Sequence, residues 1–217
     1  MDLLRYGERR TTYQFVRDTL SRAILTGQVK AGERLVQADL ARQLRVSTTP
    51  VREALRDLAA EGLIRLDAHR GAVVRELSKD EAEEIYRIRR LLEPEVMQRA
   101  VEWISEEEIE QAAEIQARAD AEDDPTRWVE LNRQFHRVFV QSAHSPRLAG
   151  IVEALQGSAS MYILAAMLHG GRRLDEANNQ HHQILQAVRD RDVEAVREAI
   201  LNHIHGTVDG VPDLGKE

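Results

Sequence analysis

The sequence contains no cysteine, which excludes a disulfide framework and any metal site built from thiolates. Proline and glycine are also scarce, with 5 and 12 among 217 residues, while hydrophobic residues make up 42% of the chain. This composition is that of a folded protein with a sizeable core rather than that of a disordered or collagen-like chain.

Long apolar segments are lacking as well. The first ten residues, MDLLRYGERR, are charged and contain no apolar stretch of the kind found in secretory signals. The longest apolar run, MYILAAML at 161–168, is too short to span a bilayer. We therefore expect a soluble protein of the cytoplasm.

The net charge of −7 is divided unevenly along the chain. Residues 1–76 carry 14 basic and 10 acidic side chains, whereas residues 77–217 carry 16 and 27. Of the eight histidines, only His69 lies in the first part. A mildly basic part followed by an acidic, histidine-rich part predicts two domains with different partners, at 1–76 and 77–217.

The first part has the element order of a winged helix-turn-helix. Apolar spacing predicts helices at 11–26, 36–44 and 49–62. Two short strands follow at 63–66 and 72–77, joined by the turn sequence DAHRG. Three helices and a hairpin in this order are typical of that DNA-binding fold.

The segment VSTTPVREAL, at 46–55, combines hydroxyl side chains, a proline and a helix start. Ser47 or Thr48 is suited to the N-cap, and Pro50 is tolerated in the first helical turn. Free N–H groups and the positive end of the helix dipole favour a phosphate at such a start. The predicted DNA contacts of this helix and of the wing are Ser47, Thr48, Thr49, Arg52, Arg56, Arg70 and Gly71.

The second part is predicted to be entirely helical. SKDE at 78–81 and SEEE at 105–108 match the capping-box pattern that begins a helix. Short loops between successive helices favour an antiparallel bundle, so the fold class is mainly α. The expected helices lie near 79–102, 106–120, 125–142, 146–169, 175–190 and 193–207.

Residues 11–74 resemble the DNA-binding domain of GntR-family bacterial transcription regulators, most specifically in PVREAL, EGL and RGAVV. The resemblance implies a homodimer on a palindromic operator, with contacts from Thr48, Thr49, Arg52, Arg70 and Gly71. Many relatives have arginine where this chain has Thr48. Where they usually have glycine in the turn, this chain has Arg45, which must then adopt a less favourable backbone conformation.

Four polar residues of the second part fall on or beside apolar helix faces. Asn132 and His136 are four residues apart, so they stack on one side of a helix. Helical phase places His181 and His203 on apolar faces and turns His182 and His205 away from them. A lone inward histidine is more typical of a hydrogen-bonded core residue, but three imidazoles and an amide can hold one divalent ion. Zinc or nickel suits the set Asn132, His136, His181 and His203 best, with manganese or iron as alternatives.

Residues 77–207 resemble the helical FCD effector domain of the FadR/VanR branch of the family, on the spacing of those four residues. Many relatives have aspartate at the position of Asn132. The resemblance implies a metal site with a pocket for a small carboxylate effector. Arg89 is expected to bind that carboxylate, with an ion pair to Glu93 as an equally weighted alternative, and Tyr162 is a lesser candidate.

The predicted function is a ligand-responsive transcription regulator, most simply a repressor, and not an enzyme. One alternative is that the metal itself is the signal. Another is a metal-dependent hydrolase, which is disfavoured because the sequence places no carboxylate beside the site as a general base.

Overall fold

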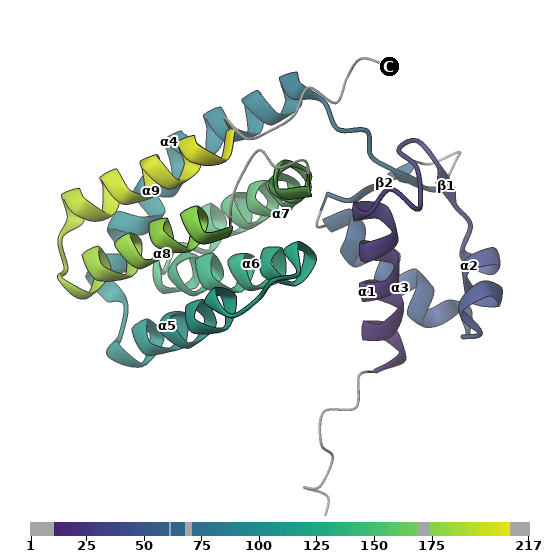
Figure 1. Ribbon diagram of the computed structural model, residues 1–217, viewed down its shortest axis with the longest axis horizontal. Helices are drawn as coiled ribbons and strands as arrows, with labels where there is room; N and C mark the ends of the chain where they lie inside the picture. Colours follow the sequence, from purple (N-terminus) through teal and green to yellow (C-terminus); the bar gives the residue numbers. More distant parts are fainter. Residues whose placement is uncertain (1–10, 61, 68–70, 169–173, 209–217) are drawn as a thin grey trace, which may run out of the picture. The chain divides into compact units, whose positions relative to one another are not determined.

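The computed structural model describes residues 11–60, 62–67, 71–168 and 174–208 (Figure 1). The chain divides into two compact units, residues 1–76 and residues 77–217. Within the described ranges it forms nine helices and a small sheet of three strands. The first unit is a winged helix-turn-helix and the second is all helical, which confirms the predicted fold class.

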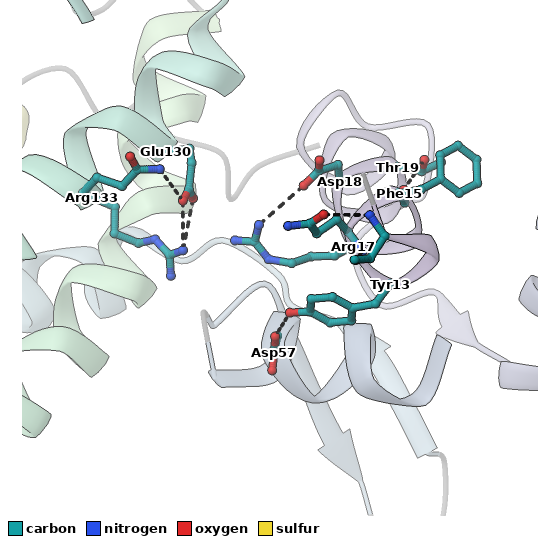
Figure 2. Close-up of polar contacts among 11 residues, drawn as sticks. Tyr13, Phe15, Arg17, Asp18, Thr19, Asp57, Glu130 and Arg133 are labelled. Atoms are coloured by element: carbon teal, nitrogen blue, oxygen red, sulfur yellow. Dashed lines mark hydrogen bonds and ion pairs between the residues drawn. The ribbon is translucent and has the colours of Figure 1, made fainter. Parts of the chain in front are cut away.

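The helices of the N-terminal unit are α1 (Thr12–Leu25), α2 (Gln37–Leu44) and α3 (Thr48–Ala60). α1 and α3 pack against each other through buried aliphatic side chains. The hydroxyl of Tyr13 on α1 donates a hydrogen bond to the carboxylate of Asp57 on α3 (Figure 2). This polar contact supplements the apolar packing and fixes one end of α1 on the helix that carries the predicted DNA contacts.

Arg45 lies in the turn between α2 and α3 with a left-handed backbone, at φ 56° and ψ 43°. Its N–H and that of Val46 donate to the last carbonyls of α2, a typical helix end for which glycine is the favoured residue. A non-glycine residue in this conformation costs about 1–2 kcal/mol. The expected unfavourable backbone at Arg45 is therefore present.

The sheet consists of β1 (Arg34–Leu35), β2 (Ile64–Asp67) and β3 (Gly71–Val74), in the order β1-β3-β2 with antiparallel neighbours. In the wing hairpin Ile64 pairs with Val74, and Asp67 pairs with Gly71. The sequence predicted β2 and β3 but not β1, because a two-residue strand has no alternation to detect.

In the C-terminal unit the described residues, 77–168 and 174–208, form six helices, and their bounds agree with the predicted ones to within a residue or two. The N-caps Ser78, Ser105 and Asp124 each accept a backbone hydrogen bond through the side chain, which explains three of the helix starts. The helices are α4 (Lys79–Trp103), α5 (Glu106–Asp120), α6 (Pro125–Ser142), α7 (Pro146–Leu168), α8 (Leu174–Arg189) and α9 (Val193–Val208).

α6 and α4 each pack against three other helices of this bundle. α6 packs against α4, α5 and α7, while α8 and α9 pack against each other and against α5 and α4 respectively. The aromatic side chains of α6 form much of the core: Trp128, Phe135 and Phe139 are fully buried. Polar residues on the same helix, one turn apart, are therefore carried into the interior.

α7 is the one described helix that is long and apolar enough to cross a membrane by length and composition. However, 56% of its apolar window is buried inside the protein. It packs against α4 and α6, and a core helix of this kind meets the same criterion. Its apolar character is explained by burial in the bundle.

Candidate metal centre and nucleic-acid face

Three histidines from three helices converge in the core of the C-terminal unit. His136 on α6, His181 on α8 and His203 on α9 are 3%, 0% and 1% exposed. One ring nitrogen from each lies within 4.8 Å of the others. The Nε2 atoms of His136 and His203 are 3.1 Å apart. These three side chains can therefore hold one metal ion.

The spacing of the ring nitrogens fits a shared ion. With metal–nitrogen bonds of about 2.1 Å, two imidazoles on one ion have their nitrogens roughly 3.0–3.4 Å apart for octahedral to tetrahedral angles. The 3.1 Å separation of the His136 and His203 Nε2 atoms lies in that range. His181 completes a set of neutral nitrogen donors that suits zinc, nickel and other borderline divalent ions.

Asn132 lies one helical turn before His136 on α6 and is 5% exposed. Its Oδ1 is buried and makes no hydrogen bond within the described residues. A buried acceptor left without a partner costs about 1–3 kcal/mol. A cation would supply that partner, so both the donor atoms and this buried oxygen fit a divalent metal.

Aromatic side chains hold the ring of His181. The ring of Phe135 stacks on it at 4.4 Å between centroids, and that of Trp128 at 5.6 Å with only 8° between the planes. The Nδ1 atom of His181 is 2.7 Å from Oε1 of Gln116, and that of His203 is 3.2 Å from Oε1 of Gln180. Both histidines thus face an amide oxygen at Nδ1.

The two glutamines were missed from the sequence, although one left a signal. Gln116 falls on the buried face of α5 between Ala112 and Ala119, where a polar side chain is unexpected. The alternative histidines were sorted correctly by helical phase, because His182 and His205 are exposed.

A narrow hollow lies beside His136, and its enclosed space admits little more than one water-sized molecule. Binding of a carboxylate there would require the lining side chains to move apart. The lining of the hollow is polar and cationic on one side. The lining residues are Arg89, Asn132, Arg133, His136, Gln156, Ser160 and Ile163.

Arg89 both forms the ion pair with Glu93 and lines this hollow. Its Nε lies 2.5 Å from Oε1 of Glu93, and the two side chains are each 2% exposed. Burial alone would lower the pKa of Arg89, but the Glu93 carboxylate and Tyr86 outweigh it and raise the pKa above its ordinary value. The guanidinium is therefore permanently charged. Its NH1 is buried and makes no hydrogen bond to the described residues.

Tyr162 does not line the hollow. Its hydroxyl donates to Oε2 of Glu81 at 2.8 Å and accepts from the backbone N–H of Ser78 at 3.3 Å. It joins the start of α4 to α7, which places the hydroxyl at that helix start and not in the hollow. By contrast, Arg133 was not predicted and lines the hollow while pairing with Glu130 (Figure 2).

In the N-terminal unit, α3 separates a buried face from an exposed one. Val51, Ala54, Leu55 and Leu58 are buried. Gly71 is exposed and has φ +75°, a conformation that favours glycine at the start of β3. Arg70 and His69 lie outside the described residues. The predicted contacts at the start and on the outer face of α3 are all exposed: Ser47, Thr48, Thr49, Arg52 and Arg56.

Comparison with known proteins matches both units to families. Residues 12–74 match the bacterial regulatory proteins of the gntR family, and residues 84–206 match the FCD domain. The chain belongs to the gntR family, with an FCD domain as its C-terminal part. It is a transcription regulator with a helix-turn-helix DNA-binding domain.

Three similar proteins support this placement. The probable D-xylose utilization operon transcriptional repressor of Paenarthrobacter nicotinovorans is 32% identical, over 90% of this chain and 87% of that protein. The uncharacterized HTH-type transcriptional regulator YdhC of Bacillus subtilis is 28% identical, over 86% and 84%. The solved structure of E. coli McbR/YncC superposes with a TM-score of 0.68 at 25% identity, covering 91% of this chain and 95% of that one. These relatives are regulators, and this protein is not an enzyme.

Proposed function

We propose that this protein is a cytoplasmic repressor that binds a palindromic operator as a homodimer and is released by a small carboxylate bound at a metal ion in the FCD domain. The relatives support the general class, since one of them is named as a probable operon repressor. The observation that carries the effector half is the convergence of three buried histidines beside a hollow lined by Arg89.

The DNA-binding half of the proposal rests on the exposed face of α3. The helix begins at Thr48, directly after Ser47, so its free N–H groups and hydroxyls are available to a phosphate of the DNA backbone. Arg52 and Arg56 follow on the exposed side, where a guanidinium in the major groove reads guanine through two hydrogen bonds. In this proposal Arg70 and Gly71 of the wing contact the sugar-phosphate backbone of the DNA.

For the metal site, we propose Asn132, His136, His181 and His203 as the ligands, with zinc or nickel as the preferred ion and manganese or iron as alternatives. All four ligands are neutral, so a divalent ion would keep its full double positive charge and attract an anion. No catalytic water chemistry is proposed, because the matched relatives are regulators.

For the effector site, we propose that Arg89 binds the carboxylate of the effector. The Glu93 carboxylate holds Nε of Arg89 and so fixes the guanidinium in place, while NH1 remains for another acceptor. A carboxylate between the metal and NH1 would satisfy both the cation and this buried donor. Effector binding would then shift the equilibrium between conformations of the helical bundle. This would change the spacing between the two DNA-binding domains of the dimer, so that they no longer fit the two operator half-sites.

The test begins with selection of bound duplexes from a random-sequence library. Affinity for a selected duplex is then measured by fluorescence anisotropy in three states: metal-free, with Zn²⁺, and with Zn²⁺ plus a carboxylate chosen from a mono-, di- and tricarboxylate panel by thermal shift. We expect a decrease in affinity of about 5–150-fold in the third state, the usual range of coupling between sites. If Zn²⁺ alone produces the change and no carboxylate adds to it, the metal is the signal and the carboxylate half of the proposal is wrong.

A further inference from the structure

A buried chain of hydrogen bonds runs behind His181 through α5, α6 and α8. The indole Nε1 of Trp128 donates to Oδ1 of Asn178 at 2.8 Å. The amide Nε2 of Gln116 donates to the same oxygen at 3.1 Å and to Oδ1 of Asp120 at 2.8 Å. The amide oxygen of Gln116 is 2.7 Å from Nδ1 of His181. The four amide and ring groups are buried, since Gln116, Trp128 and His181 have 0% exposure and Asn178 has 9%.

The direction of every bond in this chain follows from its two ends. An indole N–H is a donor only, so the atom of Asn178 that faces Trp128 must be the oxygen. An ionised carboxylate is an acceptor only, so the atom of Gln116 that faces Asp120 must be the NH₂ group. Asn178 Oδ1 and Asp120 are two independent acceptors, and both require the NH₂ group of Gln116 to point toward them.

This orientation determines the state of His181. With its NH₂ group held by Asn178 and Asp120, Gln116 turns its oxygen to Nδ1 of His181, and an amide oxygen can only accept. Nδ1 must therefore carry the proton. In a neutral imidazole the other nitrogen, Nε2, then has the lone pair that a metal ion requires.

We propose that Gln116 is a positioning residue that holds His181 in its Nδ1–H tautomer in the metal-free protein and so prepares Nε2 as a metal ligand. The proposal rests on the metal site of the proposed function. It adds that the tautomer is set by the protein before any metal binds, through Trp128, Asn178 and Asp120. Stacking of the His181 ring on Trp128 and on Phe135 fixes the ring plane, and Gln116 fixes which nitrogen is protonated.

The tautomer can be measured without metal. Metal-free protein labelled with ¹⁵N at histidine is examined by long-range ¹H–¹⁵N NMR, and His181 is assigned from a His181→Phe variant. We expect a protonated Nδ1 and an unprotonated Nε2 for His181. A protonated Nε2 in the wild-type protein would overturn the proposal, and it would do so whether or not the protein binds metal.

A variant then tests the role of Gln116. Gln116→Leu removes the amide oxygen that accepts from His181 and keeps a similar side-chain volume. The control Gln111→Leu makes the same change at an exposed position of α5. We expect Gln116→Leu to lose the single tautomer of His181 and to weaken Zn²⁺ binding by about 10–100-fold, as is typical for residues that orient a metal ligand. Affinity is measured by titration with Zn²⁺ alone in a chelator buffer, and folding by circular dichroism.

The two measurements separate the possible failures. If the wild-type protein shows the Nδ1–H tautomer but no Zn²⁺ binding, the metal half of the proposed function is wrong, and the preparation of Nε2 as a metal ligand falls with it. If Gln116→Leu folds, binds Zn²⁺ as the wild type does and keeps the tautomer, the positioning role of Gln116 is wrong. If Gln116→Leu does not fold, the wild-type tautomer alone decides the proposal.

Discussion

The Nε2 atoms of His136 and His203 lie 3.1 Å apart, although the residues are separated by 67 positions in the sequence. Two imidazole lone pairs at this distance repel each other unless a proton or a cation lies between them. In the metal-free protein one ring donates to the other, and in the metal-bound state both lone pairs would face the ion. Metal binding therefore requires the donating ring to move its proton from Nε2 to Nδ1, so that both Nε2 lone pairs face the ion while both imidazoles stay neutral.

The metal ligands can be tested by a matched pair of substitutions on α9. His203→Ala should lower Zn²⁺ affinity by more than about 100-fold, which exceeds the usual cost of losing a residue that only orients a ligand. His205→Ala, two residues later and exposed, should leave the affinity unchanged. The metal-to-protein ratio after dialysis, measured by mass spectrometry, reports the difference. Equal ratios in the two variants would remove His203 from the site.

The role of α3 in recognising the operator sequence can be tested at Arg52. Arg52→Ala should weaken binding to a selected operator duplex by about 1–3 kcal/mol and blunt the base preference at one position of each half-site. The control is Arg99→Ala, which removes an exposed arginine of α4 that pairs with Glu95. Anisotropy titrations at fixed salt provide the affinities. Wild-type affinity and base preference in Arg52→Ala would argue against α3 as the reading element.

The buried pair of Arg89 and Glu93 predicts a characteristic non-additivity. Arg89→Met leaves the Glu93 carboxylate buried without its partner and should destabilise the protein by about 3–5 kcal/mol. The double variant Arg89→Met/Glu93→Leu should recover most of that loss, because it removes both charges. Urea unfolding measures each free energy. If the double variant is as unstable as the single one, the instability arises from packing and not from the unpaired charge.

The same two variants separate stability from effector response. Both lack the guanidinium, so neither should release operator DNA on addition of the carboxylate, even where the double variant is as stable as the wild type. A double variant that still responds would remove Arg89 from the effector site.

The turn before α3 offers a test of backbone strain. Arg45→Gly should stabilise the protein by about 1 kcal/mol, since glycine adopts φ 56° without the cost paid by arginine. Arg42→Gly, three residues earlier inside α2, should instead destabilise it by a similar amount because the residue is helical. Thermal unfolding of the two variants measures both effects. A loss of stability in Arg45→Gly would show that the arginine side chain contributes more than its backbone costs.

The sequence predicts features that depend on periodicity. Helical phase distinguishes His181 from His182 because the apolar face of a helix repeats every 3.6 residues. Helix-start signals predict the six C-terminal helices, and the caps Ser78, Ser105 and Asp124 place three of their starts. Burial of Asn132 and His136 follows from their place beside the apolar stripe of α6.

Features that depend on contacts between helices could not be predicted in this way. Tyr162 lies among consecutive buried residues from Met161 to Met167, so α7 has no single apolar face that would indicate where its hydroxyl points. One constraint on Gln116 comes from Trp128 on α6 through Asn178 on α8, and no local pattern on α5 contains it. The other comes from Asp120, four residues later on α5 itself. Arg89 fits both an ion pair and a pocket wall, and only the tertiary structure shows that it serves as both.

The metal site can be located by anomalous diffraction from crystals of the Zn²⁺-loaded protein, with data collected on both sides of the zinc absorption edge. We expect one strong peak per chain among His136, His181 and His203, about 2.1 Å from a ring nitrogen of each. Bound zinc with its peak elsewhere, and none between these three rings, would contradict it.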